Sequence, residues 1–283
     1  MNSFEANISL LSSGMVALVG VPSDENSSFL RGPAQAPRQI RQVLYNGSSN
    51  LSAENGHDLG QEPRLIDIGD MPLGPGTRQA DGSQTITNHI ASLLAKDARV
   101  LSLGGDHAVT FPIVKAFAAT YPDLTILHID AHPDLYDEFE GSRVSHACPF
   151  ARIMEAGLTK RLVQVGIRTL NAHQEAQAEK FGVEMIQMTE WQPGMALNLT
   201  GPLYLSLDLD GLDPAFAPGV SHHEPGGLTT REVVDLIQSI NVPLVGADIV
   251  ELNPVRDLVG MTTAVAAKLL KEIVVKMLST EPI

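Results

Sequence analysis

The segment ILHIDAHPDLYDEF, residues 126–139, begins as an apolar strand and ends in charged side chains. Its apolar part has the residue types of a buried β-strand. Five ionisable residues follow within a few positions: Asp130, His132, Asp134, Asp137 and Glu138. Such groups are costly to bury unless a partner neutralises them. The segment therefore predicts a buried strand that delivers polar side chains to a site beyond its end.

The apolar half of this pattern recurs along the chain. Further strands are predicted at 15–22, 64–70, 98–105, 161–168, 203–210 and 243–252. Helical spacing of apolar residues is found between them, at 32–44, 86–96, 111–121, 230–240 and 261–278. Near-continuous apolar strands that alternate with helices are typical of a parallel sheet covered on both faces. We expect one α/β domain over residues 1–283.

Composition limits the classes of partner. The chain has 283 residues, 43% of them hydrophobic, and a net charge of −14. Nucleic acid is excluded as a partner because its phosphates require clustered Lys and Arg. No apolar run is long enough to cross a bilayer, so no membrane partner is expected. The single cysteine and the absence of a basic, apolar N-terminal segment predict a cytoplasmic protein.

Three predicted strands end in carboxylates and histidines, in VLSLGGDH (100–107), LTILHIDAHPD (124–134) and LYLSLDLDGLDP (203–214). Residues two apart on an extended chain share a face, which places Asp130 beside His132 and Asp208 beside Asp210. Carboxylates that converge without a cation repel one another and take up protons. Divalent metals resolve this conflict. Oxygen-rich ligands with two imidazoles and no thiolate suit Mn²⁺ better than structural Zn²⁺, and two ions balance the charge better than one.

Other residues in these segments have more ordinary explanations. An isolated Asp or His at a strand end is more often a cap or a turn former than a metal ligand. Asp106 and Asp213 are expected to anchor turns, and Cys148 to be a small buried residue. His128 shares a face with Asp130 but lies deeper in its strand, so a supporting role is expected.

The motifs GGDH (104–107), DAHPD (130–134) and SLDLDGLDP (206–214) resemble the three signatures of the ureohydrolase family, which includes arginases and agmatinases. Segments 26–41, 136–157, 213–229 and 246–257 are similar to plant arginases in particular. The resemblance implies a three-layer α/β/α sandwich with a central, mostly parallel sheet. It also implies two Mn²⁺ per chain and hydrolysis of a guanidino group to urea and an amine by a metal-bridging hydroxide.

The resemblance assigns ligands to both ions. One would be held by His107, Asp130, Asp134 and Asp208, and the other by Asp130, His132, Asp208 and Asp210. Asp130, which bridges the ions, is counted with the catalytic residues. His146 matches the family's proton-shuttling histidine, although alone it resembles an ordinary loop histidine. Glu251 matches the glutamate that pairs with the substrate guanidinium, and a buried carboxylate is suited to that role.

The far end of the substrate is less constrained. Candidate contacts, besides His146 and Glu251, are Asp137, Ser145 and Glu224, and Arg143 offers a positive charge for a carboxylate. L-Arginine is the first expected substrate, and agmatine or another guanidino acid is the alternative. Two positions depart from the family pattern. Ala108 replaces a usual serine, and His223 replaces an apolar residue of the plant enzymes, so that His222 or His223 contacts the substrate or caps a loop.

Two other classes of protein were weighed. A deacetylase of related fold would bind a single Zn²⁺, and the second set of ligands argues against it. A metal-binding scaffold without activity would not need His146. The resemblance also suggests a homo-oligomer, a trimer or a hexamer.

Overall fold

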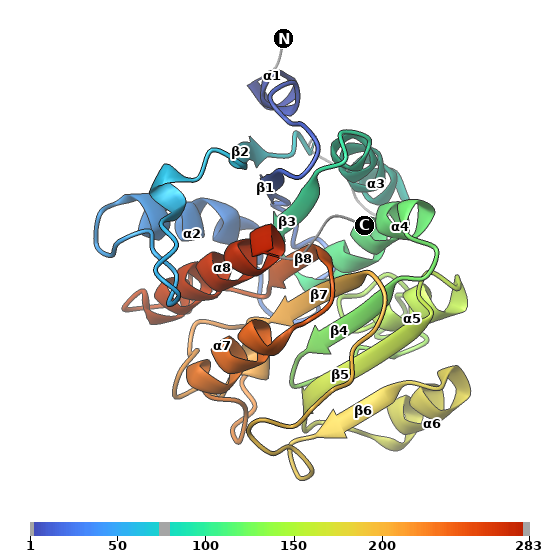
Figure 1. The fold of residues 1–283 in the computed structure, drawn as a ribbon. Helices are drawn as coiled ribbons and strands as arrows, with labels where there is room; N and C mark the ends of the chain where they lie inside the picture. The colour runs from blue at the N-terminus through green and yellow to red at the C-terminus, as the bar shows by residue number, and fades with distance from the viewer. Residues whose placement is uncertain (1–2, 74–79, 280–283) are drawn as a thin grey trace.

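The computed structural model describes residues 3–73 and 80–279. A single sheet of eight parallel strands crosses the molecule in the order β2-β1-β3-β8-β7-β4-β5-β6 (Figure 1). The strands are β1 (Val16–Gly20), β2 (Leu65–Asp70), β3 (Arg99–Leu103), β4 (Thr125–Ile129), β5 (Arg161–Ile167), β6 (Glu184–Gln187), β7 (Leu203–Asp208) and β8 (Leu244–Val250). The prediction of a parallel sheet is confirmed, and within the described residues every strand pairing is parallel.

Helices cover both faces of the sheet, as the three-layer prediction requires. Figure 1 shows α2, α7 and α8 on one side and α3, α4, α5 and α6 on the other. The helices are α1 (Ser3–Ile8), α2 (Ala36–Tyr45), α3 (Ala80–Leu94), α4 (Thr110–Thr120), α5 (Pro149–Glu155), α6 (Ala172–Phe181), α7 (Thr230–Ser239) and α8 (Met261–Ser279). Helix α7 begins at a capping box in which Thr229 and Glu232 satisfy each other's backbone N–H groups.

Strand β4 shows why its sequence is apolar throughout. Leu127 and Ile129 point into the core shared with α2, α7 and α8, whereas Ile126 points into the core shared with α3, α4 and α5. All five residues of the strand are buried. Because both faces of the sheet are covered, side chains on either face of β4 must be apolar unless a polar side chain has a buried hydrogen-bond partner.

One strand and three helices were not predicted. Strand β6 has four residues at the edge of the sheet and is partly exposed, so it lacks the continuous apolar signal of the central strands. Helix α6 is mostly polar; it begins at the Asn171 cap and ends at Gly182, where φ is +66°. Helices α1 and α5 have six and seven residues, too few to show a helical period.

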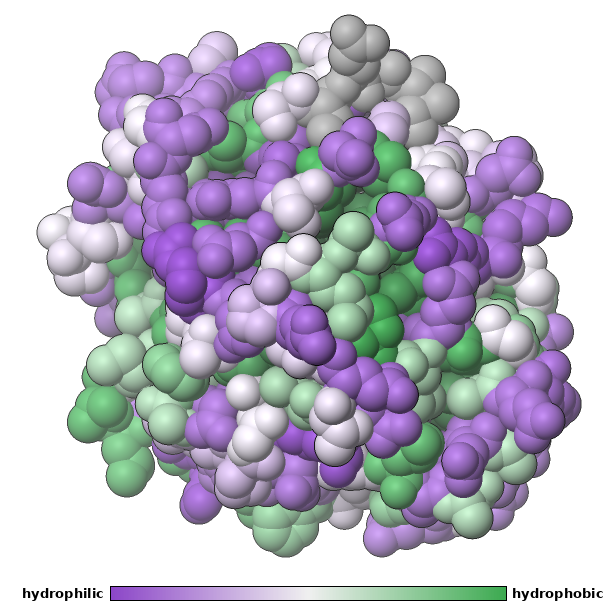
Figure 2. Space-filling view, turned by 60° about the horizontal axis from the view of Figure 1, so that its bottom comes forward, coloured by the Kyte–Doolittle hydropathy of each residue, from purple (hydrophilic) through white to green (hydrophobic). Residues whose placement is uncertain are grey.

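The surface is mostly hydrophilic on the face in Figure 2, where hydrophobic residues gather in a central hollow and in a projection at the lower left. Four exposed apolar side chains lie just before and at the start of α8: Val255, Leu258, Val259 and Met261. No helix in the described ranges has the length and apolar character needed to cross a membrane.

Candidate active site

Four neighbouring strands, β3, β8, β7 and β4, carry the site at their carboxyl ends. Each contributes residues at its last position or in the turn that follows: His107 after β3, Glu251 after β8, Asp208 and Asp210 at and after β7, and Asp130, His132 and Asp134 after β4. Parallel strands end at the same edge of the sheet, so residues far apart in sequence meet there. The six predicted metal ligands are therefore brought together.

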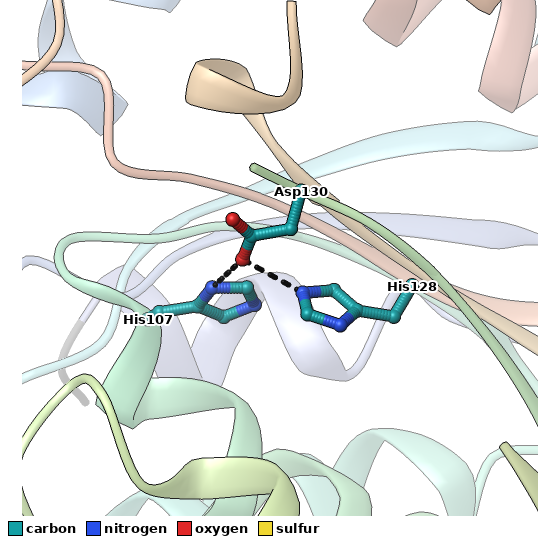
Figure 3. Close-up of side chains that lie close together, drawn as sticks. All are labelled: His107, His128 and Asp130. Atoms are coloured by element: carbon teal, nitrogen blue, oxygen red, sulfur yellow. Dashed lines mark hydrogen bonds and ion pairs between the residues drawn. The ribbon is translucent and has the colours of Figure 1, made fainter. Parts of the chain in front are cut away.

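The first group surrounds the ring of His107, which is fully buried. Its Nδ1 lies 3.1 Å from Oδ2 of Asp130, 3.2 Å from Oδ2 of Asp134 and 3.1 Å from Oδ2 of Asp208. Figure 3 shows the carboxylate of Asp130 with one oxygen facing the rings of His107 and His128 and the other pointing away. One nitrogen and three carboxylate oxygens thus converge on one position.

The second group uses the other oxygen of Asp130. Oδ1 lies 3.3 Å from Nδ1 of His132, which in turn lies 3.2 Å from Oδ2 of Asp210. These atoms are close enough to share an ion. Because Asp130 turns one oxygen to each group, it occupies the position of a bridging ligand.

A network of hydrogen bonds behind His107 determines which nitrogen of its ring carries the proton. Ser206 donates its hydroxyl proton to Oδ1 of Asp248 at 2.7 Å, so its oxygen accepts from Nε2 of His107 at 3.0 Å. Tyr204 and Thr110 donate to the second oxygen of Asp248. With the proton on Nε2, the Nδ1 lone pair of His107 faces three carboxylates, an arrangement that needs a cation.

The pKa shifts of the clustered groups also indicate a site that needs a cation. Burial, together with the negative charges of Asp210 and Asp130, raises the pKa of Asp208 well above its usual value. Burial and Asp130 raise the pKa of Asp134 to about 6. Burial opposes the charged form of His107, yet three carboxylates that accept hydrogen bonds from the protonated ring raise its pKa well above 6.5. A proton thus occupies the place of a cation, and the oxygen-rich donor set fits divalent metal ions.

His128 supports the cluster. Its Nε2 donates to Oδ2 of Asp130 at 2.8 Å, and its Nδ1 accepts from Gln164 at 2.9 Å. Its ring stacks on Phe150, with 3.8 Å between ring centroids. His107, His128 and Asp130 are close enough together to hold a metal ion. Both nitrogens of His128 already make hydrogen bonds, however, so we assign His128 to orienting Asp130 and not to binding metal.

Two carboxylates of the site lie on left-handed backbone. Asp134 has φ +51° and Glu251 has φ +63°, values that residues other than Gly, Asn and Asp seldom adopt. Such conformations cost about 1–3 kcal/mol and persist where the surrounding structure holds them. The backbone is bent at the points where these two side chains are turned toward the cavity.

Glu251 pairs with His146. Its Oε1 accepts from Nδ1 of His146 at 2.8 Å and from the backbone N–H of His107 at 2.9 Å. Nε2 of His146 lies 2.8 Å from Oγ of Ser28. Burial opposes the charge on His146, but the carboxylate of Glu251 outweighs it and raises the pKa of the imidazole to about 9. Oε2 of Glu251 is buried and has no hydrogen-bond partner among the described residues.

A cavity of about 200 Å³ joins the metal cluster to this pair. Its lining includes four of the predicted metal ligands, His132, Asp134, Asp208 and Asp210, together with His146 and Glu251. Ser28, Tyr136, Phe139 and His222 also line it. A small molecule in this cavity would lie beside both the Glu251 carboxylate and the cluster of His and Asp side chains.

Three predicted contacts are not among the residues that line this cavity. Asp137 is paired with Arg143 and Arg152. Ser145 is buried beside a neighbouring cavity. Glu224 contributes its backbone carbonyl to Arg168, which donates to it at 2.6 and 2.9 Å.

Sequence reasoning missed other residues of the site. Arg168 also donates to the carbonyl of Asp210 at 2.7 Å and so holds the loop that follows β7. Ser28 comes from the loop after β1, and no pattern in that loop indicates a contact with His146. Asp106 and Asp213 accept backbone N–H groups, as predicted for turn anchors. Cys148 is buried, as expected.

Fold and site together define a class of metal-dependent hydrolase built on a parallel α/β sheet. The sequence profile of the Arginase family matches residues 15–275. Arginase 1, mitochondrial, of Arabidopsis thaliana is 45% identical over 92% of this chain and 80% of its own. An agmatinase of Bacillus cereus is 35% identical over 91% and 90%. The solved arginase of Medicago truncatula superposes with a TM-score of 0.90 at 41% identity, covering 97% of this chain and 91% of its own.

The chain belongs to the arginase family. It is therefore a hydrolase of the arginase and agmatinase type, which acts on guanidino compounds at a binuclear metal centre. The resemblance seen in the motifs is confirmed. The single-zinc deacetylase and the inactive scaffold lose their support.

The prediction of a cytoplasmic protein is wrong. Relatives from Arabidopsis thaliana and Oryza sativa are named as mitochondrial arginases, and one from Arabidopsis thaliana as chloroplastic/mitochondrial. The prediction rested on the single cysteine and on the absence of a basic, apolar N-terminal segment, and neither property identifies a compartment by itself.

Proposed function

We propose that this chain hydrolyses L-arginine to L-ornithine and urea with two Mn²⁺ per chain. The observation that carries the proposal is the buried Oε2 of Glu251, which has no partner among the described residues and belongs to a residue that lines the same cavity as the carboxylate cluster. A guanidinium is planar and cationic, and a carboxylate binds it through paired hydrogen bonds. Such a group, held at Glu251, would present its carbon toward the cluster.

The six ligands are proposed in the arrangement expected from the motifs. His107, Asp130, Asp134 and Asp208 would hold one ion, and Asp130, His132, Asp208 and Asp210 the other. The distances around His107 and His132 support this division. When bound, the two ions would supply an activated water and offset negative charge that develops at the reacting carbon.

The remaining chemistry belongs to side chains. Glu251 would bind and orient the guanidinium. With a pKa of about 9, His146 holds a proton at neutral pH beside the cavity and would provide it to the leaving amine. Ser28 would keep the imidazole in place through Nε2.

The choice of L-arginine rests on the relatives. Six arginases of plants are 43–45% identical to this chain, whereas the agmatinases of two Bacillus species are 35% identical. Agmatinase, or hydrolysis of another guanidino acid, is the alternative. Urea release from L-arginine, agmatine and 4-guanidinobutyrate should be compared with Mn²⁺-loaded protein. A higher kcat/KM for agmatine than for L-arginine would overturn the choice.

Three further proposals carry over from the sequence. Residues 1–283 form one catalytic domain. The protein is a homo-oligomer, a trimer or hexamer, and the exposed apolar group Val255, Leu258, Val259 and Met261 offers a contact surface. Asp137, Ser145 and Glu224 remain predictions for the substrate tail, although none lines the cavity of this structure. Light scattering tests the oligomer, and a monomer at micromolar concentration would contradict it.

A further inference from the structure

Two residues that line the cavity each have a buried polar atom without a partner in the described part of the chain. The atoms are Oε2 of Glu251 and Nε2 of His222. Unpaired buried polar atoms are rare in folded proteins because each loses its hydrogen bonds to water. Within the described residues, no internal contact accounts for Nε2 of His222. The pairing of both atoms with one ligand would account for them together.

The ring of His222 lies close to the Glu251 pair. Its centroid is 5.2 Å from that of His146 and 6.0 Å from that of His132. Both nitrogens of His146 are already engaged, by Glu251 and by Ser28. His222 therefore has a free nitrogen on a ring that neighbours His146, the partner of the carboxylate proposed to hold the substrate.

We propose that His222 accepts a hydrogen bond from the substrate guanidinium, on an edge that Glu251 leaves free. This inference rests on the proposed function. An alkylguanidinium has five N–H groups, and a carboxylate covers only one edge of the plane. A second acceptor on another edge fixes the rotation of that plane as well as its position. Nε2 can accept when the ring proton is on Nδ1.

A purely structural role for His222 must be distinguished from this one. The ring also lies 5.7 Å from that of Phe29, centroid to centroid, so it contributes packing to the cavity wall. His222→Phe keeps an aromatic ring and removes the nitrogen, and His222→Asn keeps a polar group in a smaller side chain. His223→Ala is the matched control, because His223 is exposed and contacts the carbonyl of Pro218.

The test measures kcat and KM for L-arginine, agmatine and 4-guanidinobutyrate. His222→Phe should raise KM by about 10- to 100-fold, the loss of one hydrogen bond to a charged group. The factor should be the same for each compound that the wild-type protein hydrolyses, because the guanidinium is common to them. His222→Asn should recover part of the loss, and His223→Ala should stay within about twofold.

Two inhibitors provide a second readout. Guanidinium chloride at millimolar concentration should inhibit His222→Phe more weakly than the wild type by a similar factor. The amine product, which lacks the guanidinium, should inhibit both equally. Manganese content and thermal midpoint should match the wild type, which separates binding from assembly of the site.

The outcomes separate the two proposals. Unchanged KM in His222→Phe, or factors that differ between the three compounds, would overturn the role of His222. The second result would place the residue at the substrate tail. Equal weakening of the amine product would also overturn it. A wild-type protein that releases no urea from any guanidino compound would instead refute the proposed function, and the inference with it.

Discussion

Nδ1 of His146 lies 2.8 Å from Oε1 of Glu251, and the second oxygen of the glutamate is buried without a hydrogen-bond partner among the described residues. The pair is buried, and its two charges support each other. The pair therefore brings together a carboxylate that could bind a cationic group and an imidazole that carries a proton. The first prediction follows from this pair.

Glu251→Gln removes the charge and keeps the shape of the side chain. We expect kcat/KM for the preferred guanidino compound to fall by about 100- to 1000-fold, since a charge-assisted contact at the reacting group is lost. Manganese content should stay unchanged because Glu251 is not among the proposed ligands. Glu179→Gln, on the exposed surface of α6, is the control. Activity near the wild-type level in Glu251→Gln would contradict the proposed role.

Asp130→Asn should remove the bridge between the two ligand groups. An amide offers one acceptor oxygen where the carboxylate offers two. We expect manganese per chain, measured by elemental analysis, to fall, and urea release to drop by about 1000-fold or more. The far-ultraviolet circular dichroism should match that of the surface control Asp123→Asn. Retained turnover in Asp130→Asn would remove it from the site.

Asp248→Asn tests the network behind His107. Asp248 accepts from Ser206, Tyr204 and Thr110, and through Ser206 it sets which nitrogen of His107 carries the proton. We expect manganese affinity to weaken by about 10- to 100-fold, the usual cost of disturbing residues behind a metal ligand. Tyr204→Phe leaves Ser206 in place and should weaken affinity less. Equal effects of the two variants would contradict this order of importance.

Glu54 gives a prediction for pH. Hydrogen bonding from Arg231 is the main cause that lowers the pKa of Glu54 from 4.5 to about 2. A carboxyl with a lowered pKa stabilises the folded state above the unfolded pKa, and this contribution is lost as pH falls from about 4.5 to 2. The side chain of Arg231 is 57% exposed and that of Glu54 is 34% exposed. Solvent therefore screens the pair, and its contribution to the free energy of unfolding is about 1 kcal/mol or less.

Thermal unfolding of Glu54→Gln checks this. The variant should have a lower midpoint than the wild type at pH 7, and the difference should narrow as pH is lowered through 4 to 3. A difference that grows in acid would have the opposite sign and would exclude this account.

The convergence of the proposed ligands at one edge of the sheet could be predicted from the sequence, because the underlying geometry is local. A period of two fixes which side chains share a face of a strand, and parallel strands end at one edge. Asp130 and His132 show this, as do Asp208 and Asp210. The depth of His128 in its strand predicted a supporting role, and His128 does contact Asp130. Its other partner, Gln164, lies in β5, and the sequence did not predict that contact.

Two of the cavity residues that come from loops could not be predicted from the sequence. Ser28 and His222 come from irregular loops after β1 and β7, whose paths depend on long-range contacts such as those of Arg168. Sequence left His222 and His223 as equal candidates, and the loop turns only His222 inward. Asp137 was expected near the substrate, but Arg143 and Arg152 occupy it, and such ion pairs have no signature in spacing.

The order of the strands has a consequence for biosynthesis. The innermost strands carry the site, and β8, which lies between β3 and β7, is the last of the eight described strands in sequence. The backbone N–H of His107 and Oε1 of Glu251 lie 2.9 Å apart, although the two residues are separated by 144 positions. A ribosome-bound chain that stops before residue 244 already holds the six proposed ligands but lacks β8, which pairs with both β3 and β7. The site is therefore expected to assemble only after β8 has been synthesised.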